Sequence, residues 1–235
     1  MKIILFMIVL FVSNIIQTIT GFAGNMLAMP PSMLLIGYKS AEVTINIFSL
    51  MICCLVAFQE RHHIDSQVLI KTIGLMSLGM LFSILFLHHY DLSCLKKIYG
   101  FFIIAIACNH LFIHWKIPDQ TYIDMMIIFL SGVIHELFLS GGALLVVYIA
   151  KTLPDKYVFR STLSCLWVII DCLLIYDHAS QHLYTTANIY LILLSTIPLV
   201  ISYVIGKKLV DKVSQKQFMI LTYILLIFSG SMSLL

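Results

Sequence analysis

The chain has 235 residues, of which 61% are apolar and only 11% are charged, and its mean hydropathy is +1.03. A soluble domain carries about a quarter charged residues, so this composition excludes a soluble globular protein and indicates one that lies in a lipid bilayer. The net charge of +3 comes from lysines in short linkers and gives no reason to expect a nucleic-acid partner.

Eight apolar stretches are long enough to cross a bilayer as helices, because about 20 residues cover about 30 Å of hydrocarbon. We predict spans near 3–20, 41–58, 67–87, 95–114, 122–139, 158–176, 187–206 and 217–234. The linkers between these spans are short, so the whole chain is expected to form one transmembrane domain. The predicted fold is an all-α polytopic transmembrane helical bundle.

Two shorter apolar pieces, 22–37 and 142–153, are bounded or interrupted by glycine and proline. The second piece has about 12 residues, too few to cross a bilayer unaided. We therefore expect both pieces to be broken or re-entrant helices that pack inside the bundle. If both pieces cross instead, the number of crossings becomes ten.

Lysine and arginine accumulate on the cytoplasmic side of membrane proteins, and ten of the 14 share one face in either model, which places both termini outside. With eight crossings, Lys39 and Arg160 share that face and Arg61 lies on the other. With ten crossings, Arg61 and Arg160 share it and Lys39 lies on the other. The charges therefore leave the number of crossings open.

A shift of about 118 residues aligns two halves of the chain, as in transporters built from internal repeats. Residues 24–30 then align with 142–148, and residues 42–46 align with 160–164. Each half contains a span, a glycine-marked break, a short apolar piece, a polar turn and further spans. The two predicted repeats cover about 3–115 and about 120–235.

The first break follows the pattern Gly-x-x-Gly-x-x-Leu-x-x-Pro, at Gly21, Gly24, Leu27 and Pro30. In the second half, Tyr148 stands in place of the proline. Because glycines close a first span and a helix begins near a threonine in both halves, the chain resembles the sulfite exporter TauE/SafE family of membrane transporters. The resemblance covers nearly the whole chain and implies ion-coupled movement of small anions such as sulfite or sulfoacetate.

Glycine at a helix break suits an anion, because the bare backbone exposes N–H groups and the positive end of a helix dipole. We therefore predict a substrate site near the midplane, formed by the breaks, by polar residues that begin the next helices and by one arginine. Its predicted members are Gly21, Gly24, Asn25, Thr44, Asn46, Gly141, Gly142, Arg160 and Thr162. Close helix packing by the glycines, and an interfacial charge at Arg160, are the alternatives.

His135, Glu136 and Asp171 are ionisable residues in the interior of predicted spans, where polar groups are costly and often functional. His135 and Glu136 align with Gln17 and Thr18 before the first break, and we predict that they form a proton-coupling pair. Asp171 is a second candidate for proton coupling. The alternatives are a helix-end role for the pair and a structural hydrogen bond for Asp171.

No phosphate-binding loop or protease motif occurs in the sequence, and we expect no catalytic residue, no cofactor and no metal. His110 and His114 have a metal-ligand spacing, but no neighbouring residue completes a set.

The predicted function is secondary transport of a small anion, sulfite or an organosulfonate, across the inner membrane by alternating access. The expected partners are this anion and the lipid bilayer, and the sequence indicates no oligomeric state. An intramembrane enzyme and a non-transporting assembly factor are the alternatives.

Overall fold

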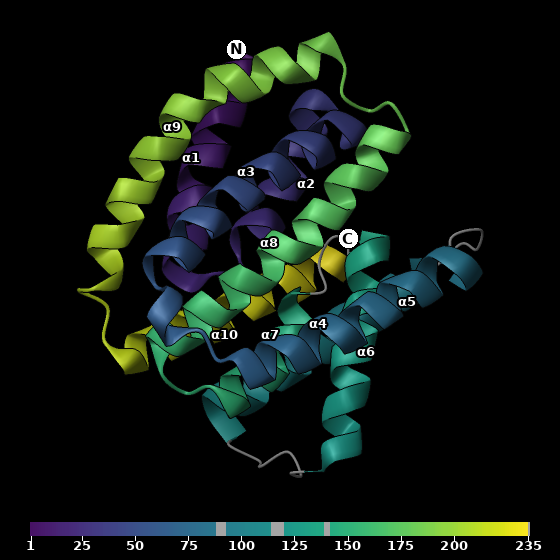
Figure 1. Cartoon of the computed structure of the whole chain (residues 1–235), viewed down its shortest axis with the longest axis vertical. Coiled ribbons are helices and arrows are strands. Elements are labelled where there is room, and N and C mark those ends of the chain that lie inside the picture. Colours follow the sequence, from purple (N-terminus) through teal and green to yellow (C-terminus); the bar gives the residue numbers. More distant parts are fainter. Residues whose placement is uncertain (88–92, 114–119, 139–141, 235) are drawn as a thin grey trace. The chain divides into compact units, whose positions relative to one another are not determined.

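The computed structural model describes residues 1–87, 93–113, 120–138 and 142–234, which lie almost entirely in helices (Figure 1). The α-helices are α1 (Lys2–Thr20), α2 (Gly24–Ile36), α3 (Tyr38–Gln59), α4 (Ser66–Phe82), α5 (Ser93–Cys108), α6 (Thr121–Phe138), α7 (Gly142–Thr152), α8 (Lys156–Ser180), α9 (Thr186–Val210) and α10 (Gln215–Leu234). Short 3₁₀ and π segments extend them at η1 (Arg61–His63), η2 (Ser83–Leu87) and η3 (Asn109–Ile113). These ranges contain no strand, and the predicted all-α fold is confirmed.

The described helices have the length and surface of membrane spans. Five are long and apolar enough to cross a bilayer, namely α1, α3, α8, α9 and α4 extended by η2. Large apolar side chains are exposed on their outer faces, as on α9, where Leu193 is 64% exposed and Ile197 is 70% exposed. Lipid accommodates such a surface, whereas a soluble monomer rarely exposes large apolar patches. The protein is therefore a multi-pass membrane protein.

The helices form two compact units, and each unit takes helices from both halves of the sequence. Unit 1 is Met1–Leu69 with Tyr157–Val213, and it contains α1, α2, α3, α8 and α9. Unit 2 is Ile70–Lys156 with Ser214–Leu235, and it contains most of α4 with α5, α6, α7 and α10. The two units therefore do not follow the division into two predicted repeats.

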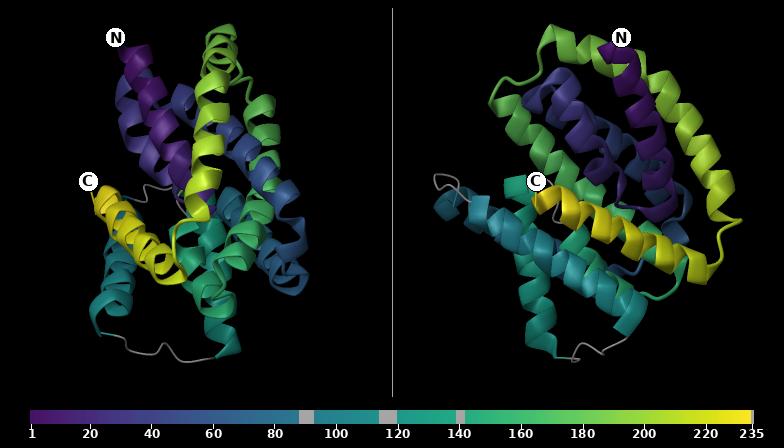
Figure 2. Two further views of the ribbon diagram at one scale, coloured as in Figure 1. Left: turned by 90° about the vertical axis from the view of Figure 1, so that its left-hand side faces the viewer. Right: turned by 180° about the vertical axis from the view of Figure 1, so that it is seen from behind.

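In unit 1, helix α1 packs against α2, α3 and α9 (Figure 2). The apolar core between them is made by Phe6, Leu10, Ala28, Ala41, Ile45, Phe48, Ile52, Val56 and Leu199. Close approach of α9 to α1 depends on Gly206, where a Cβ would come within 2.6 Å of the Thr18 side chain. Small residues at such crossings let membrane helices pack backbone to backbone.

Helices α1 and α3 run in the same direction, and α2 carries the chain back between them (Figure 1). Gln17 lies near the C-terminal end of α1, and its Nε2 donates to Sγ of Cys53 in the second half of α3, at 3.3 Å. The 13 residues of α2 give it a length of about 20 Å at about 1.5 Å per residue. The first predicted short piece, 22–37, is therefore a continuous helix that runs opposite to α1 and α3.

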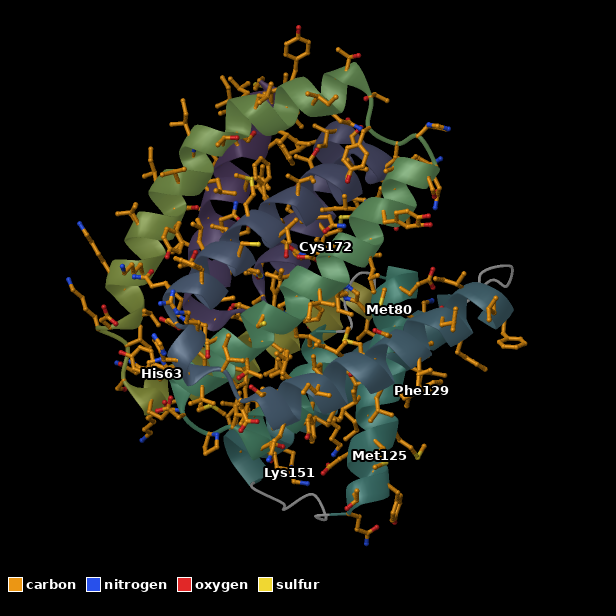
Figure 3. The ribbon with its side chains drawn as sticks, in the orientation of Figure 1. His63, Met80, Met125, Phe129, Lys151 and Cys172 are labelled. Atoms are coloured by element: carbon orange, nitrogen blue, oxygen red, sulfur yellow. The ribbon has the colours of Figure 1, made fainter. Side chains whose placement is uncertain are left out.

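In unit 2, helices α4 and α6 cross at two glycines. A Cβ at Gly79 would overlap the carbonyl oxygen of Phe129, which Figure 3 labels, and a Cβ at Gly132 would overlap the carbonyl oxygen of Met76. Neither oxygen belongs to a flexible side chain, so a substitution at these glycines requires a shift of the backbone.

We expect Gly79→Ala to destabilise the protein by about 1–3 kcal/mol, because the added methyl group overpacks this crossing. The measurement is the thermal unfolding midpoint in detergent. Gly74→Ala is the control on the same helix, since no atom lies within 4 Å of a Cβ there. Equal midpoints for the two variants would contradict a close crossing at Gly79.

Candidate functional site

Polar and charged side chains lie along one face of α3. They are Glu42, Asn46, Ser49, Cys53 and Glu60. Successive members are three, four or seven residues apart, so they share one side of the helix. Asn46, Ser49 and Cys53 are buried, which is unusual for polar groups in a membrane helix unless they have a role.

This face of α3 contacts α8, which runs antiparallel to it (Figure 1). The contacts in order along α3 are Glu42 with His178, Ser49 with Asp171, and Glu60 with Arg160. The partner positions on α8 fall steadily in number as those on α3 rise. Helices α3 and α8 are therefore aligned over most of their length, with Met51 and Ile169 at the middle of the pair.

The antiparallel arrangement bears on the number of crossings. Glu60, next to Arg61, binds Arg160, so the end of α3 and the start of α8 lie together. With ten crossings Arg61 and Arg160 share one face of the membrane, whereas with eight they lie on opposite faces. The ion pair therefore favours the ten-crossing model that the sequence left open.

The guanidinium of Arg160 is held by acceptors from two other helices of unit 1. Its Nε donates to Oε2 of Glu60 at 3.0 Å, its Nη2 donates to Oε1 of Glu60, and its Nη1 donates to the carbonyl oxygen of Thr18 at 3.0 Å. Arg160 is only 2% exposed. Gly21, with a φ of 81°, packs against the backbone of Arg160, where a Cβ would come within 3.0 Å. The planar donor face predicted for an anion therefore binds a carboxylate of this chain.

The first glycine break is closed by side chains of α1. The N–H of Gly24 donates to Oε1 of Gln17 at 2.6 Å, and the N–H of Ala23 donates to Oγ1 of Thr20 at 3.2 Å. A Cβ at Gly24 would come within 2.5 Å of the Gln17 Cβ, so Gly24 also permits close packing of α2 on α1. These donors at the start of α2 are therefore occupied by protein groups.

Several buried side chains on α3 and α8 have polar atoms without a hydrogen-bond partner in the described part of the chain. Among them are Oγ1 of Thr44, both amide atoms of Asn46, Oγ of Ser164 and Oδ2 of Asp171. All four residues are at most 2% exposed. Leaving a buried polar group unpaired costs about 1–3 kcal/mol, so such groups usually have a functional explanation. These four residues mark the candidate site of unit 1, which extends along the α3–α8 pair.

Thr162 and Asn25 were also predicted as site residues, but they are not among these four. Thr162 accepts at Oγ1 from the N–H of Asp65 at 2.9 Å and so holds the start of α4. Asn25 is half-buried on α2. Ser164 was not predicted, although the repeat aligns it with Asn46, and that alignment is the signal that could have found it.

The remaining predicted site residues lie in unit 2 or outside the residues that the structure describes. His135 is 3% exposed on α6, and the next residue, Glu136, accepts at Oε2 from Oγ of Ser83 at 2.5 Å. Gly142 is buried at the start of α7. Gly141 lies outside the described residues.

The second histidine of the candidate metal pair, His114, also lies outside the described residues. Among the described residues, no group of three or more histidine, cysteine, aspartate or glutamate side chains could hold a metal ion.

A bundle of apolar helices with unpartnered polar groups buried at membrane depth is typical of membrane transporters. The chain belongs to the sulfite exporter TauE/SafE family, whose model matches residues 5–232. Comparison with curated proteins and with solved structures finds no match. The predicted family is therefore confirmed, and with it membrane transport as the general function.

Proposed function

We propose that the protein is a secondary transporter that moves a small anion, sulfite or an organosulfonate, across the inner membrane by alternating access. The family supports anion export by a membrane transporter rather than an enzyme. The observation that carries the site is the carboxamide of Asn46, which is 2% exposed and has no hydrogen-bond partner at either polar atom among the described residues. Burying such an amide without a partner costs roughly 2–7 kcal/mol, so a ligand that accepts its hydrogen bonds has a clear energetic reason to bind there.

The donor set suits an oxyanion. Asn46 offers two N–H groups, and the hydroxyl groups of Thr44 and Ser164 offer one donor each. These donors are neutral, so they can bind an anion without holding it as strongly as a buried arginine would. Asn46 and Ser164 lie on opposite sides of the middle of the α3–α8 pair, each about 7 Å from it at about 1.5 Å per residue. An anion that moves along this interface would meet both.

Asp171 provides the coupling in this proposal. It lies between Asn46 and Ser164 along the pair, and Ser49 hydrogen-bonds it. Two negative charges in contact at low dielectric repel strongly, so the anion passes Asp171 only when the carboxyl group carries a proton. Each anion is thereby linked to one proton, as reciprocal binding linkage requires.

His135 and Glu136 form a proposed second proton site in unit 2. Glu136 accepts a hydrogen bond from Oγ of Ser83 in that unit. In this proposal Gly21 packs against Arg160 and Gly24 lets α2 pack on α1, and neither glycine binds the anion directly.

Binding of ³⁵S-labelled sulfite to purified protein in detergent tests the site. We expect Asn46→Leu to weaken the affinity at least about tenfold, because it removes both amide donors while keeping the number of side-chain heavy atoms. Ser164→Ala should weaken it less, since one hydroxyl group is lost. Unlabelled sulfoacetate should compete in the wild-type protein.

Ser195→Ala is the matched control. Ser195 is also buried in unit 1, and its hydroxyl group has no hydrogen-bond partner among the described residues, but it lies on α9 rather than on α3 or α8. The Ser195→Ala variant should bind sulfite with the same affinity as the wild-type protein. Wild-type affinity in Asn46→Leu, or an equal loss in Ser195→Ala, would contradict the proposed site.

A further inference from the structure

Each end of the α3–α8 pair carries one contact between an acid and a base, and the contact with histidine is an ion pair when the imidazole is protonated. At one end, Oε1 of Glu42 lies 3.6 Å from Nε2 of His178. At the other end, Glu60 binds Arg160 through two donors. The acid comes from α3 and the base from α8 in both pairs. His178 and Arg160 are almost fully buried, with side-chain exposures of 3% each, whereas Glu42 and Glu60 retain 17% and 13%.

The repeat relates these two ion pairs to each other. A shift of 118 residues places Glu42 on Arg160 and Glu60 on His178. The same shift therefore converts one ion pair into the other, with the acid and the base exchanged. This is the relation that a twofold axis across an antiparallel pair of equivalent helices produces. The acid–base pairs at the two ends of the α3–α8 pair are thus at equivalent positions of the repeat.

The unpartnered residues of the candidate site keep the same relation. Asn46 follows Glu42 by four residues, and Ser164 follows Arg160 by four residues. Four residues make one helical turn, so each unpartnered group lies one turn inside an ion pair. An anion held at Asn46 or at Ser164 is therefore separated from the adjacent end of the helix pair by an acid and its basic partner.

We propose that these two ion pairs are the gates of the transport pathway and that they open in alternation. This inference rests on the transport function proposed above. Glu60–Arg160 closes the pathway at the side that the ten-crossing model makes cytoplasmic, and Glu42–His178 closes it at the other side. Opening a gate admits water to both of its charges, so separation there costs less than it would in a dry interior.

Reversible cross-linking distinguishes a gate from a permanent structural contact. The starting protein is a cysteine-free variant in which Cys53, Cys54, Cys94, Cys108, Cys165 and Cys172 are replaced by serine. Cysteine pairs are then placed at Glu42 with His178 or at Glu60 with Arg160, and each is closed with a short thiol-reactive linker. Cross-linking either pair should lower sulfite counterflow in proteoliposomes at least about tenfold, and reduction of the linker should restore it.

The control cross-link lies near the middle of the same helices. Cys54 and Cys172 are repeat-equivalent, lie within electrostatic range of each other, and Figure 3 labels Cys172 on α8. Retaining only these two cysteines and linking them should leave counterflow within about twofold, because the middle of a rocking pair moves least. Full counterflow with either end cross-linked would overturn the gate proposal.

A distance measurement tests the gates without any transport. Spin labels at Lys39 and Asp177 report on one end, and labels at Arg61 and Tyr157 report on the other, while both ion pairs stay intact. Each end should show a short and a long population in lipid. A single short distance at both ends, with and without sulfite, would overturn the proposal. Absence of sulfite counterflow in the wild-type protein would instead contradict the proposed function and leave this distance test valid.

Discussion

Glu60→Gln is expected to lower the stability of the protein by about 3–5 kcal/mol, because it leaves Arg160 buried without a carboxylate partner. The guanidinium would then keep the carbonyl oxygen of Thr18 and, at position 60, one uncharged amide oxygen in place of a carboxylate. Unfolding in increasing denaturing detergent, followed by circular dichroism, measures this loss. The double variant Glu60→Gln, Arg160→Gln should recover most of it, since neither charge remains.

Asp124→Asn is the control for this prediction. It breaks the ion pair of Asp124 with Lys151, whose side chains are 17% and 25% exposed, and whose Nζ to Oδ1 distance is 3.2 Å. A pair at that exposure contributes about 0–1 kcal/mol, so little change is expected. An equal loss in Asp124→Asn and Glu60→Gln would contradict the special burial of Arg160.

Asp171→Asn is expected to abolish proton movement with sulfite while leaving sulfite exchange in place. Asparagine keeps the volume of aspartate but stays neutral, so it resembles the protonated carboxyl group that lets the anion pass. Net sulfite flux driven by a pH gradient should therefore fall at least about tenfold, while counterflow should persist. A pH-sensitive dye inside the liposomes measures the protons, and labelled sulfite measures the anion.

Glu136→Gln separates the two proposed proton sites. If Asp171 carries the coupling proton, the Glu136→Gln variant retains the sulfite-linked acidification of the liposome interior that the dye reports. Loss of acidification in Glu136→Gln with normal coupling in Asp171→Asn would assign coupling to the α6 carboxyl group instead. Normal acidification in Asp171→Asn contradicts the role proposed for Asp171 in every case.

The helices could be predicted from the sequence because bilayer thickness sets their length. The eight predicted spans and the two short pieces correspond to α1–α10 within a few residues, apart from the parts that lie outside the described residues. Gly21 ends α1 in the left-handed conformation, as expected for glycine at a helix end. Local chemistry determines these features, so a single sequence contains the signal.

The partners of the site residues could not be predicted, because they come from distant parts of the chain. Arg160 was expected to bind an anion, and its carboxylate partner Glu60 lies 100 residues away. The close packing of Gly24 depends on Gln17, which comes near only because α2 turns back on α1. Gly24→Leu would therefore disturb helix packing first, which makes Asn46→Leu the cleaner test of binding.

The assignment of helices to the two units could not be predicted from the sequence either. Helices α8 and α9 join α1–α3 in unit 1, whereas the repeat alone suggests two separate halves. The contact of Glu60 with Arg160, which bears on the number of crossings, could not be predicted for the same reason. Ser164, by contrast, could have been found by extending the alignment of Asn46 from one repeat to the other.

Sulfite transport is tested directly by counterflow of labelled sulfite into proteoliposomes. These contain the wild-type protein and are preloaded with unlabelled sulfite. We predict uptake well above that of protein-free liposomes, and we predict that external sulfoacetate competes with it more strongly than sulfate does. Folded, reconstituted protein that gives no sulfite or sulfoacetate counterflow at any pH between about 5 and 8 would contradict the proposed substrate and transport function.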